Sequence, residues 1–490
     1  MRRIRAWLAL VGAIACGACT IDPRVRLATA MTSHLICSQV FVASQNPEQA
    51  YREMVLAMPG MQRADWALNY SVDPVRREVR ATAGGVFAHR AVYREGQGCV
   101  IVPDDAPVAS AAAPPAQVGA APPPAQAGAA PPLLASVAGQ DVVAPANERL
   151  AAAIDAAFAE VGGAPLRRTK AIVVIHNGRV VGERYAPGVG VDTPMLSFSA
   201  AKSVVNALIG ILVREGRLSV TQRAPIAAWS AAGDARASIT IDQLLRHTSG
   251  LALSQDYSGF DQASRMHFLE RDMAAFAERA PAAAPPGSRW AYSDGNYVIL
   301  SRIIRDSVGG NPADVVALAR RELFGPLGMG SVTIEFDAAG TPMGSSYLYA
   351  SARDWARFGM LYLGDGAVGG QRILPRDWVR YSAAPTAGAD LGYGAGFWTN
   401  RGGSEGARRR IAAGMPADAF FAGGVLGQYI VVVPSANLVV VRFGINDDWP
   451  NFDVEGVSRL VGDVIAALPA RSDASPRGGA RPRGAAGRRP

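Results

Sequence analysis

The sequence predicts an α+β fold, with an antiparallel sheet flanked by helices and a helical lobe at its side. Two predicted β-hairpins lie near opposite ends of the main domain, with turns at residues 176–178 and 434–437. The first turn contains Asn-Gly between two β-rich runs, which is a strong hairpin signal. The sequence between the hairpins is mostly typical of helices and loops. We therefore expect a sheet built from both ends of the domain and a lobe built from its middle.

The elements of this domain can be assigned in chain order. A helix is expected to begin after the N-cap Asn147 and to end at the glycine pair 162–163. A closing helix, with an apolar stripe over residues 454–465, should end before Pro469. The four strands of the hairpins are expected at residues 171–175, 179–181, 428–433 and 438–443.

At 490 residues the chain exceeds one ordinary domain, and its composition divides it into five segments. Residues 1–19 combine arginines with a short apolar run, as an export signal does. A small segment at 21–103 is followed by an extended Ala/Pro-rich linker at 104–143. The main domain is expected at 144–468 and a disordered Gly/Pro/Arg-rich tail at 469–490.

The segment at 21–103 is too small for a generous core of its own. Strand-like runs are expected in it at 39–43 and 85–93. Cys37 and Cys99 are the two cysteines beyond the signal. Two cysteines in an exported chain predict one disulfide, which would act as the staple of this segment.

The export signal leaves two alternatives open. Cys16 and Cys19 each follow small residues, as in a lipoprotein cleavage site, but neither has the favoured Leu three positions before it. The protein is therefore expected in the periplasm after simple cleavage, or attached to the outer membrane of a bacterium as a lipoprotein. A lipid anchor would be its only contact with a membrane.

The formal net charge of +8 is concentrated at the two ends of the chain. Three arginines lie within the first five residues, and the last twenty residues hold six arginines and one aspartate. The body between them has no net formal charge, so a phosphate-binding face has no support there. We expect no nucleic-acid partner, and the sequence does not indicate an oligomeric state.

The candidate chemistry begins at Ser199-Ala-Ala-Lys202, where a strongly apolar helix starts. Lys202 lies three residues after Ser199, on the same helix face, and can reach its hydroxyl. A serine hydroxyl needs a base to act as a nucleophile, and burial favours the neutral form of lysine that can serve as one. Lys170 and Lys202 are the only lysines among the 49 lysine and arginine residues. A lysine on this helix therefore indicates that the site needs a titratable amine.

Ser-x-x-Lys is the nucleophile motif of serine β-lactamases and penicillin-binding proteins. LSFSAAKSVVNALIGILVREGRL around Ser199 and TIDQLLRHTSGL at 240–251 resemble the class C β-lactamase-like esterase branch of that superfamily. Three further segments resemble the nylon-oligomer (aminohexanoate-dimer) hydrolases: ERYAPG at 183–188, ARFGMLYL at 356–363 and YGAGFW at 393–398. The resemblance covers about residues 165–467 and implies a β-lactamase/D,D-peptidase-like fold.

By the same resemblance, Tyr292-Ser293-Asp294 matches the Tyr-x-Asn motif of this branch. Tyr292, as phenol or phenolate, would lie opposite Ser199 and pass a proton between that serine and the leaving group. Asp294 replaces the amide, so an ionised side chain there can only accept hydrogen bonds. We expect Asp294 in the substrate-binding site, where its charge would repel a carboxylate and could pair with an amine.

The third motif of the branch, Lys-Thr-Gly or His-x-Gly, aligns with Ala422-Gly423-Gly424, which lacks the cation. Gly424 would let the backbone approach the substrate closely. The backbone amides of Val425 and Ser199 would form the oxyanion hole. The missing cation argues against the carboxylate of a β-lactam or a D-alanyl peptide as the preferred recognition group.

Trp398 is expected to form a wall of the substrate pocket, with plain core packing as its alternative. The five histidines show no metal-ligand spacing, so we expect no metal and no cofactor. His247, in a His-Thr-Ser-Gly turn, is interpreted as architectural. No nucleophile-elbow glycines surround Ser199, which disfavours a Ser-His-Asp scheme.

These observations predict an exported serine hydrolase that forms an acyl-enzyme on Ser199 and hydrolyses small esters or linear amides. A D,D-peptidase or β-lactamase, acting on peptidoglycan peptides or β-lactams, is the alternative among enzymes. A catalytically silent cell-envelope binding protein is the alternative outside them. The presence of Ser199, Lys202 and Tyr292 together argues against a silent protein.

Overall fold

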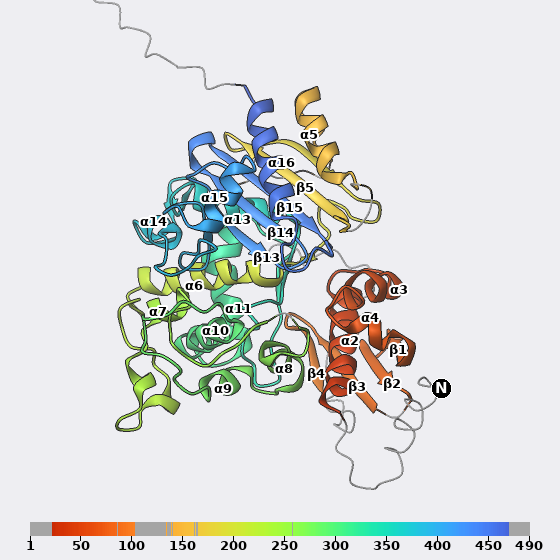
Figure 1. Ribbon diagram of the computed structural model, residues 1–490, viewed down its shortest axis with the longest axis vertical. Coiled ribbons are helices and arrows are strands. Elements are labelled where there is room, and N and C mark those ends of the chain that lie inside the picture. Colours follow the sequence, from red (N-terminus) through yellow and green to blue (C-terminus); the bar gives the residue numbers. More distant parts are fainter. Residues whose placement is uncertain are drawn as a thin grey trace, which may run out of the picture.

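The computed structural model describes residues 22–85, 87–102, 134, 139, 141–160, 162, 165–256 and 258–469. The predicted signal, most of the predicted linker and the predicted basic tail lie outside the described residues. Figure 1 shows a large α+β domain, coloured from yellow to blue, with a smaller N-terminal unit in red and orange beside it. We use "N-terminal unit" for residues 22–102 and "main domain" for residues 141–469.

The main domain is built on a six-stranded antiparallel sheet with the order β12-β13-β14-β15-β5-β6. Its middle pairs β15 from the end of the domain with β5 from its beginning, with Val440 opposite Val174. Both predicted hairpins are present, and Asn177 and Gly178 take the left-handed conformation that a tight hairpin turn requires. The six strands are β5 (Thr169–His176), β6 (Arg179–Tyr185), β12 (Trp398–Thr399), β13 (Phe420–Gly424), β14 (Gln428–Val433) and β15 (Leu438–Gly444).

Alternating apolar residues give this sheet two buried faces. Ile172 and Val174 pack in one core with α5 (Glu148–Phe158) and α16 (Val454–Ala467), whereas Val173 and Ile175 belong to the other core. The second core also contains α13 (Ala352–Leu363). The side chain of Asn147 accepts a hydrogen bond from the Leu150 amide at the start of α5, as the sequence predicts.

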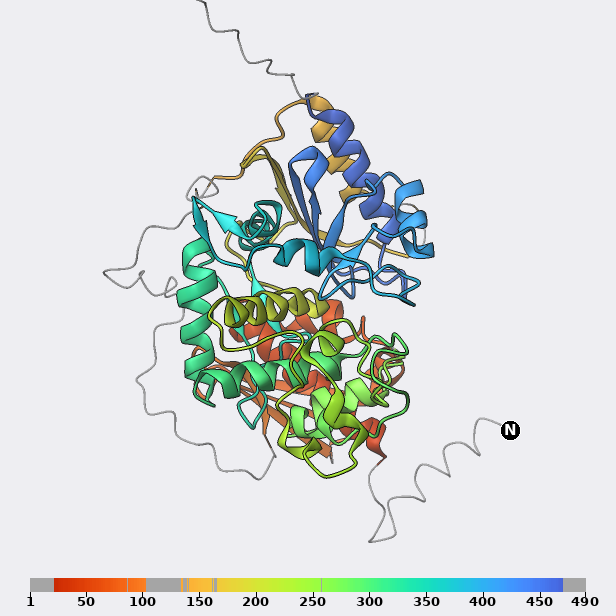
Figure 2. The same ribbon diagram turned by 90° about the vertical axis from the view of Figure 1, so that its left-hand side faces the viewer.

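The helical lobe lies below the sheet in Figure 2, and α6 (Ala201–Arg214) separates the two. Every residue of α6 from Ala201 to Leu212 is buried, as expected for a helix with apolar residues on all sides. The other helices of the lobe are α7 (Ile241–Leu245), α8 (Gln262–Leu269), α9 (Met273–Glu278), α10 (Asp294–Val308), α11 (Pro312–Ala319) and α12 (Gly325–Leu327). Smaller elements are α14 (Trp378–Ala383), α15 (Glu405–Ala412), the sheet of β7 (Met195–Leu196), β9 (Leu348–Ala350) and β8 (Thr333–Ile334), and the pair β10 (Ala367–Val368) and β11 (Gln371–Arg372).

The N-terminal unit is a long helix, α2 (Pro23–Phe41), packed on a four-stranded antiparallel sheet. The predicted strand at 39–43 is wrong, because Gln39 to Phe41 form the last turn of α2. Val40, Phe41 and Val42 are partly buried and pack against the main core as the continuation of a helix whose preceding turns are buried, and this packing overrides their strand propensity. The second predicted strand is present as β3. The remaining elements are α3 (Pro47–Ala50), α4 (Met61–Ala64), β1 (Leu68–Asp73), β2 (Glu78–Ala83), β3 (Phe87–Arg94) and β4 (Gly98–Val102).

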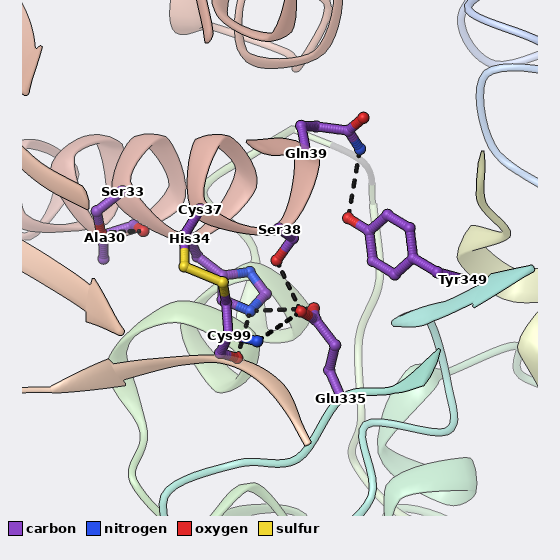
Figure 3. The surroundings of a disulfide bond; sticks show 9 residues. All are labelled: Ala30, Ser33, His34, Cys37, Ser38, Gln39, Cys99, Glu335 and Tyr349. Carbon is purple, nitrogen blue, oxygen red and sulfur yellow. Dashed lines mark hydrogen bonds and ion pairs between the residues drawn. A yellow bond between two sulfur atoms is a disulfide. The ribbon is translucent and has the colours of Figure 1, made fainter. Parts of the chain in front are cut away.

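A disulfide joins Cys37 of α2 to Cys99 of β4, as the sequence predicts (Figure 3). Glu335 of the main domain reaches this point and accepts hydrogen bonds from Ser38 Oγ and the Cys99 amide, each at 2.8 Å. Its other carboxyl oxygen lies 3.3 Å from His34 Nε2. Burial raises the pKa of Glu335 to about 8 and lowers the pKa of His34 to about 4. At neutral pH, His34 and Glu335 are therefore both uncharged where the two parts of the chain meet.

The two parts of the chain are also joined elsewhere, with α2 packed against α8 of the lobe. Lys170 forms an ion pair with Glu53, and Gln39 donates a hydrogen bond to the Tyr349 hydroxyl. Among the helices of the described residues, none has the length and apolar content needed to cross a membrane.

Candidate active site

Ser199 lies in a 3-10 turn, Phe198–Ala200, directly before α6. Phe198 has a φ angle of +45°, a left-handed conformation that a bulky residue rarely adopts. Backbone strain of this kind is held in place by the packing around it and is concentrated at functional sites. Ser199 is largely buried, with 8% of its surface exposed, and lines a small pocket.

The end of β13 packs directly against this turn. A Cβ atom at Gly424 would lie 2.3 Å from the carbonyl oxygen of Ser197 and 3.1 Å from the amide nitrogen of Ser199. Only glycine allows this approach. The approach places the next residue, Val425, in the lining of the same pocket as Ser199. Ser199 and Val425, whose backbone amides are predicted to form the oxyanion hole, thus line the same pocket.

Lys202 is buried at the first turn of α6, and its amine is surrounded by three acceptors. Nζ lies 3.0 Å from Ser199 Oγ, 2.5 Å from Asp294 Oδ1 and 2.8 Å from the carbonyl oxygen of Ser345. Burial lowers the pKa of Lys202 below its usual value, while the charge of Asp294 acts in the opposite direction. A neutral amine in this position keeps two N–H bonds for Asp294 and Ser345 and can direct its lone pair at the Ser199 hydroxyl.

Tyr292 contacts both of these residues. Its hydroxyl is near enough to the Ser199 side chain for that side chain to lower the pKa of Tyr292, and Lys202 Nζ lies 4.9 Å from its ring centroid. Burial, with a further contribution from Asp294, raises the pKa of Tyr292 well above its ordinary value. The hydroxyl is therefore a neutral phenol that can donate or accept a proton. The structure thus brings together Ser199, Lys202 and Tyr292, the three residues predicted to be catalytic.

Asp294 lies in the site, but its carboxylate is engaged by protein side chains. It begins α10, and its carboxylate is fully engaged inside the protein: Lys202 binds one oxygen, and His267 Nε2, at 3.0 Å, and Ser346 Oγ, at 3.3 Å, contact the other. Burial alone would raise the pKa of Asp294, but Lys202 and His267 hold it well below its ordinary value. Asp294 lines the pocket, as expected, but both of its carboxylate oxygens are already bound by protein groups.

Trp398 lies beside the candidate catalytic tyrosine. Its ring stacks on that of Tyr292, with centroids 5.5 Å apart. This contact fits the packing alternative, and the pocket wall stays a prediction. Ala422, where the cation of the third motif is missing, is fully buried in β13.

Several pocket residues carry no motif that sequence reasoning could have found. The pocket has a volume of about 90 Å³. Its polar lining includes Gln255, which accepts a hydrogen bond from the Asp294 amide, and His267. Met31, Met58 and Pro59 of the N-terminal unit complete the lining. Sequence reasoning assigned no role in the site to that unit.

The structure also places His247 and the possible metal ligands. His247 is buried, and burial followed by the charge of Lys202 lowers its pKa well below the usual value. Its Nδ1 accepts the Ser293 amide at 3.3 Å, next to Tyr292, which fits an architectural role. Within the part of the chain that the structure describes, no three His, Cys, Asp or Glu side chains are grouped so that they could hold a metal ion.

Comparisons with known proteins agree with this arrangement. The family model described as Beta-lactamase matches residues 154–460. The 6-aminohexanoate-dimer hydrolase of Paenarthrobacter ureafaciens is 23% identical, and the match covers 62% of this chain and 79% of that protein.

Solved structures show the same fold. A putative 6-aminohexanoate-dimer hydrolase from Bacillus anthracis is similar with a TM-score of 0.52 and 24% identity, covering 62% of this chain and 81% of that one. A penicillin-binding protein homologue from Caulobacter crescentus is similar with a TM-score of 0.51 and 20% identity, covering 67% of this chain and all of that one. A family VIII carboxylesterase gives a TM-score of 0.51 at 17% identity, over 67% of this chain and 99% of that one.

The family match begins after the N-terminal unit and covers most of the main domain. The predicted α+β fold of the β-lactamase/D,D-peptidase type is confirmed. The chain is a serine hydrolase that belongs to the beta-lactamase family.

Proposed function

We propose that the protein hydrolyses small esters or linear amides through an acyl-enzyme on Ser199, with Lys202 as the base. The observation that carries this proposal is the 3.0 Å contact between Lys202 Nζ and Ser199 Oγ in a buried site. Burial lowers the pKa of Lys202, which increases the fraction of neutral amine available at a given pH.

In the first half-reaction, neutral Lys202 takes the proton of Ser199 while Oγ attacks the carbonyl carbon of the substrate. The carbonyl oxygen becomes an oxyanion, which the amides of Ser199 and Val425 stabilise. The bond to the leaving group then breaks. The Tyr292 hydroxyl gives its proton to the leaving group and regains one from Lys202, so that no net proton is lost.

In the second half-reaction, water replaces the leaving group. Lys202, with Tyr292 as relay, removes a proton from the water as its oxygen attacks the acyl carbon. The same amides hold the second oxyanion, and Ser199 leaves with the proton returned by Lys202. An acid is released and the starting enzyme is restored.

Two observations favour esters and linear amides over β-lactams. The relatives include a protein named 6-aminohexanoate-dimer hydrolase and a neighbour titled carboxylesterase. Ala422, at the position of the third motif in β13, supplies no cation for the carboxylate that a β-lactam carries next to its scissile ring. A D,D-peptidase or β-lactamase is the competing activity. The main argument against this competing activity is the missing cation at Ala422. The charge of Asp294 is a weaker argument, because Asp294 is paired with Lys202.

Steady-state kinetics with p-nitrophenyl butyrate and nitrocefin tests this choice. We expect the specificity constant for the ester to be the higher one, with both activities absent from a Ser199→Ala variant. A higher specificity constant for nitrocefin would reassign the protein as a β-lactamase.

We also propose that the protein is exported, either with a cleaved signal or with a lipid anchor on Cys16 or Cys19. The Cys37–Cys99 disulfide supports an oxidising compartment. Cell fractionation with labelled palmitate tests both points. Label that depends on one of these cysteines indicates a lipoprotein, unlabelled periplasmic protein indicates simple cleavage, and cytosolic protein contradicts export.

A further inference from the structure

The junction of the N-terminal unit and the main domain contains a second, larger cavity. It has a volume of about 780 Å³ and shares Met58, Pro59 and Trp449 with the lining of the Ser199 pocket. The two cavities are therefore adjacent, and these three side chains form the boundary between them. We call the larger one the basic chamber.

The lining of the basic chamber is strongly cationic. Arg24, Arg52, Arg63 and Arg168 contribute to it, against one acidic residue, Asp447. Asp447 is already engaged, because its carboxylate lies 3.4 Å from Arg168 and accepts a hydrogen bond from the Leu166 amide.

Two of these arginines are available for a ligand. Arg52 is bound to Glu48, whereas neither Arg24 nor Arg63 has an acidic partner within ion-pair distance among the described residues. The guanidinium of Arg24 lies 6.0 Å from the ring centroid of Phe260, another residue of the chamber.

Close backbone contacts fix the boundary between the chamber and the pocket. A Cβ atom at Gly259 would lie 2.3 Å from the Pro59 carbonyl oxygen, and one at Gly60 would lie 2.6 Å from the ring of Phe260. Trp449 Nε1 donates a hydrogen bond to the Ala57 carbonyl at 3.2 Å. The boundary is thus built by both parts of the chain in fixed contact, as substrate-positioning walls must be.

We infer that the basic chamber binds a carboxylate carried by the substrate, several bonds away from the scissile carbonyl at Ser199. Guanidinium groups match a carboxylate in geometry and charge, and the chamber offers two that have no acidic partner among the described residues. The inference rests on the proposed hydrolase function and adds a substrate class, esters or amides with a distal carboxylate. Such a carboxylate differs from that of a β-lactam, which lies beside the reacting bond rather than several bonds away from it.

The test compares two series of substrates on the full chain. Mono-p-nitrophenyl esters of adipate, pimelate and suberate carry the distal carboxylate, and p-nitrophenyl hexanoate, heptanoate and octanoate are their neutral counterparts. Shorter dicarboxylates are avoided because their own carboxylate attacks the ester. Arg24→Gln, Arg63→Gln and the double variant remove the charge while keeping a polar side chain. Arg76→Gln is the matched control, because Arg76 is exposed on the same unit and does not line the chamber.

We expect the wild type to prefer the carboxylate ester at one or more chain lengths. The double variant should lower that preference about fivefold or more through KM, with the neutral esters changed less than about twofold. Arg76→Gln should keep the preference, and 0.5 M salt should weaken it in the wild type. Two results would overturn the chamber assignment. One is a wild-type preference for the neutral ester at every chain length. The other is a preference for the carboxylate ester that is unchanged in the double variant. Normal turnover of the neutral esters in that case would leave the proposed function standing, whereas failure of every ester to acylate Ser199 would overturn both.

Discussion

Lys202 Nζ lies 2.5 Å from Asp294 Oδ1, and both side chains are almost completely buried. A charge pair at this distance in a poorly hydrated site interacts far more strongly than in water. Asp294 therefore favours the protonated form of Lys202, while burial favours the neutral form that can act as a base. The balance between these two opposing effects sets the pH at which Ser199 can be activated.

Asp294→Asn should shift the acid limb of the pH profile of kcat/KM to lower pH. The substitution removes the charge that raises the pKa of Lys202, so the neutral amine appears at lower pH, while the amide oxygen can still accept a hydrogen bond. The profile with p-nitrophenyl butyrate measures the shift. An acid limb that stays in place or moves to higher pH would show that another group controls it.

Lys202→Arg should lower kcat/KM for the same ester by at least about 100-fold, because a guanidinium stays protonated and cannot act as a base. Circular dichroism checks that the buried site tolerates the larger group, and Lys202→Met serves as an uncharged variant of similar length. Activity within about tenfold of wild type, roughly 1.4 kcal/mol in barrier height, would mean that Lys202 only positions Ser199.

Tyr292→Phe should reduce amide hydrolysis more than ester hydrolysis. The variant keeps the ring stacked on Trp398 and removes the hydroxyl that contacts Ser199. An amine leaving group needs a proton, whereas p-nitrophenolate leaves without one. A p-nitroanilide and a p-nitrophenyl ester with the same acyl group give the comparison. Equal losses in kcat for both substrates would contradict a proton-transfer role.

Glu335→Gln should stabilise the protein increasingly as the pH rises from about 5 to 8. The pKa of Glu335 is raised in the folded state to about 8, so folding retains a proton that the unfolded chain releases in this window. The contribution of Glu335 to wild-type stability therefore falls as the pH rises, at a rate on the order of 1 kcal/mol per pH unit, and glutamine removes that contribution.

Urea unfolding at pH 5, 6.5 and 8 measures the difference between wild type and Glu335→Gln. Glu95→Gln is the control for this comparison, since Glu95 is exposed on the N-terminal unit that Glu335 contacts. A Glu335→Gln protein that is less stable than wild type at pH 8 would mean that Glu335 is ionised in the folded state and contributes as an anion.

Local patterns in the sequence were enough to predict the central sheet and the nucleophile helix. The hairpin at Asn177, the cap at Asn147 and the apolar run after Lys202 each depend on neighbouring residues alone. The end of α2 at Gln39 to Phe41 was mispredicted because its helical state depends on packing against distant parts of the chain, including the bond of Gln39 to Tyr349.

The site could be predicted only where a motif marks it. Ser199, Lys202 and Tyr292 lie in motifs, and the structure brings them together. The pairing of Asp294 with His267 joins residues 27 positions apart with no shared pattern. The contribution of Met58 to the pocket depends on how the N-terminal unit docks, which local sequence does not encode.

Mass spectrometry of the intact protein after brief mixing with p-nitrophenyl butyrate tests the central claim most directly. The account predicts one added butyryl group per chain, mapped by peptide digestion to Ser199 and absent from Ser199→Ala. Lys202→Arg should accumulate it much more slowly. A butyryl group mapped to another residue, or ester turnover retained in Ser199→Ala, would contradict the account.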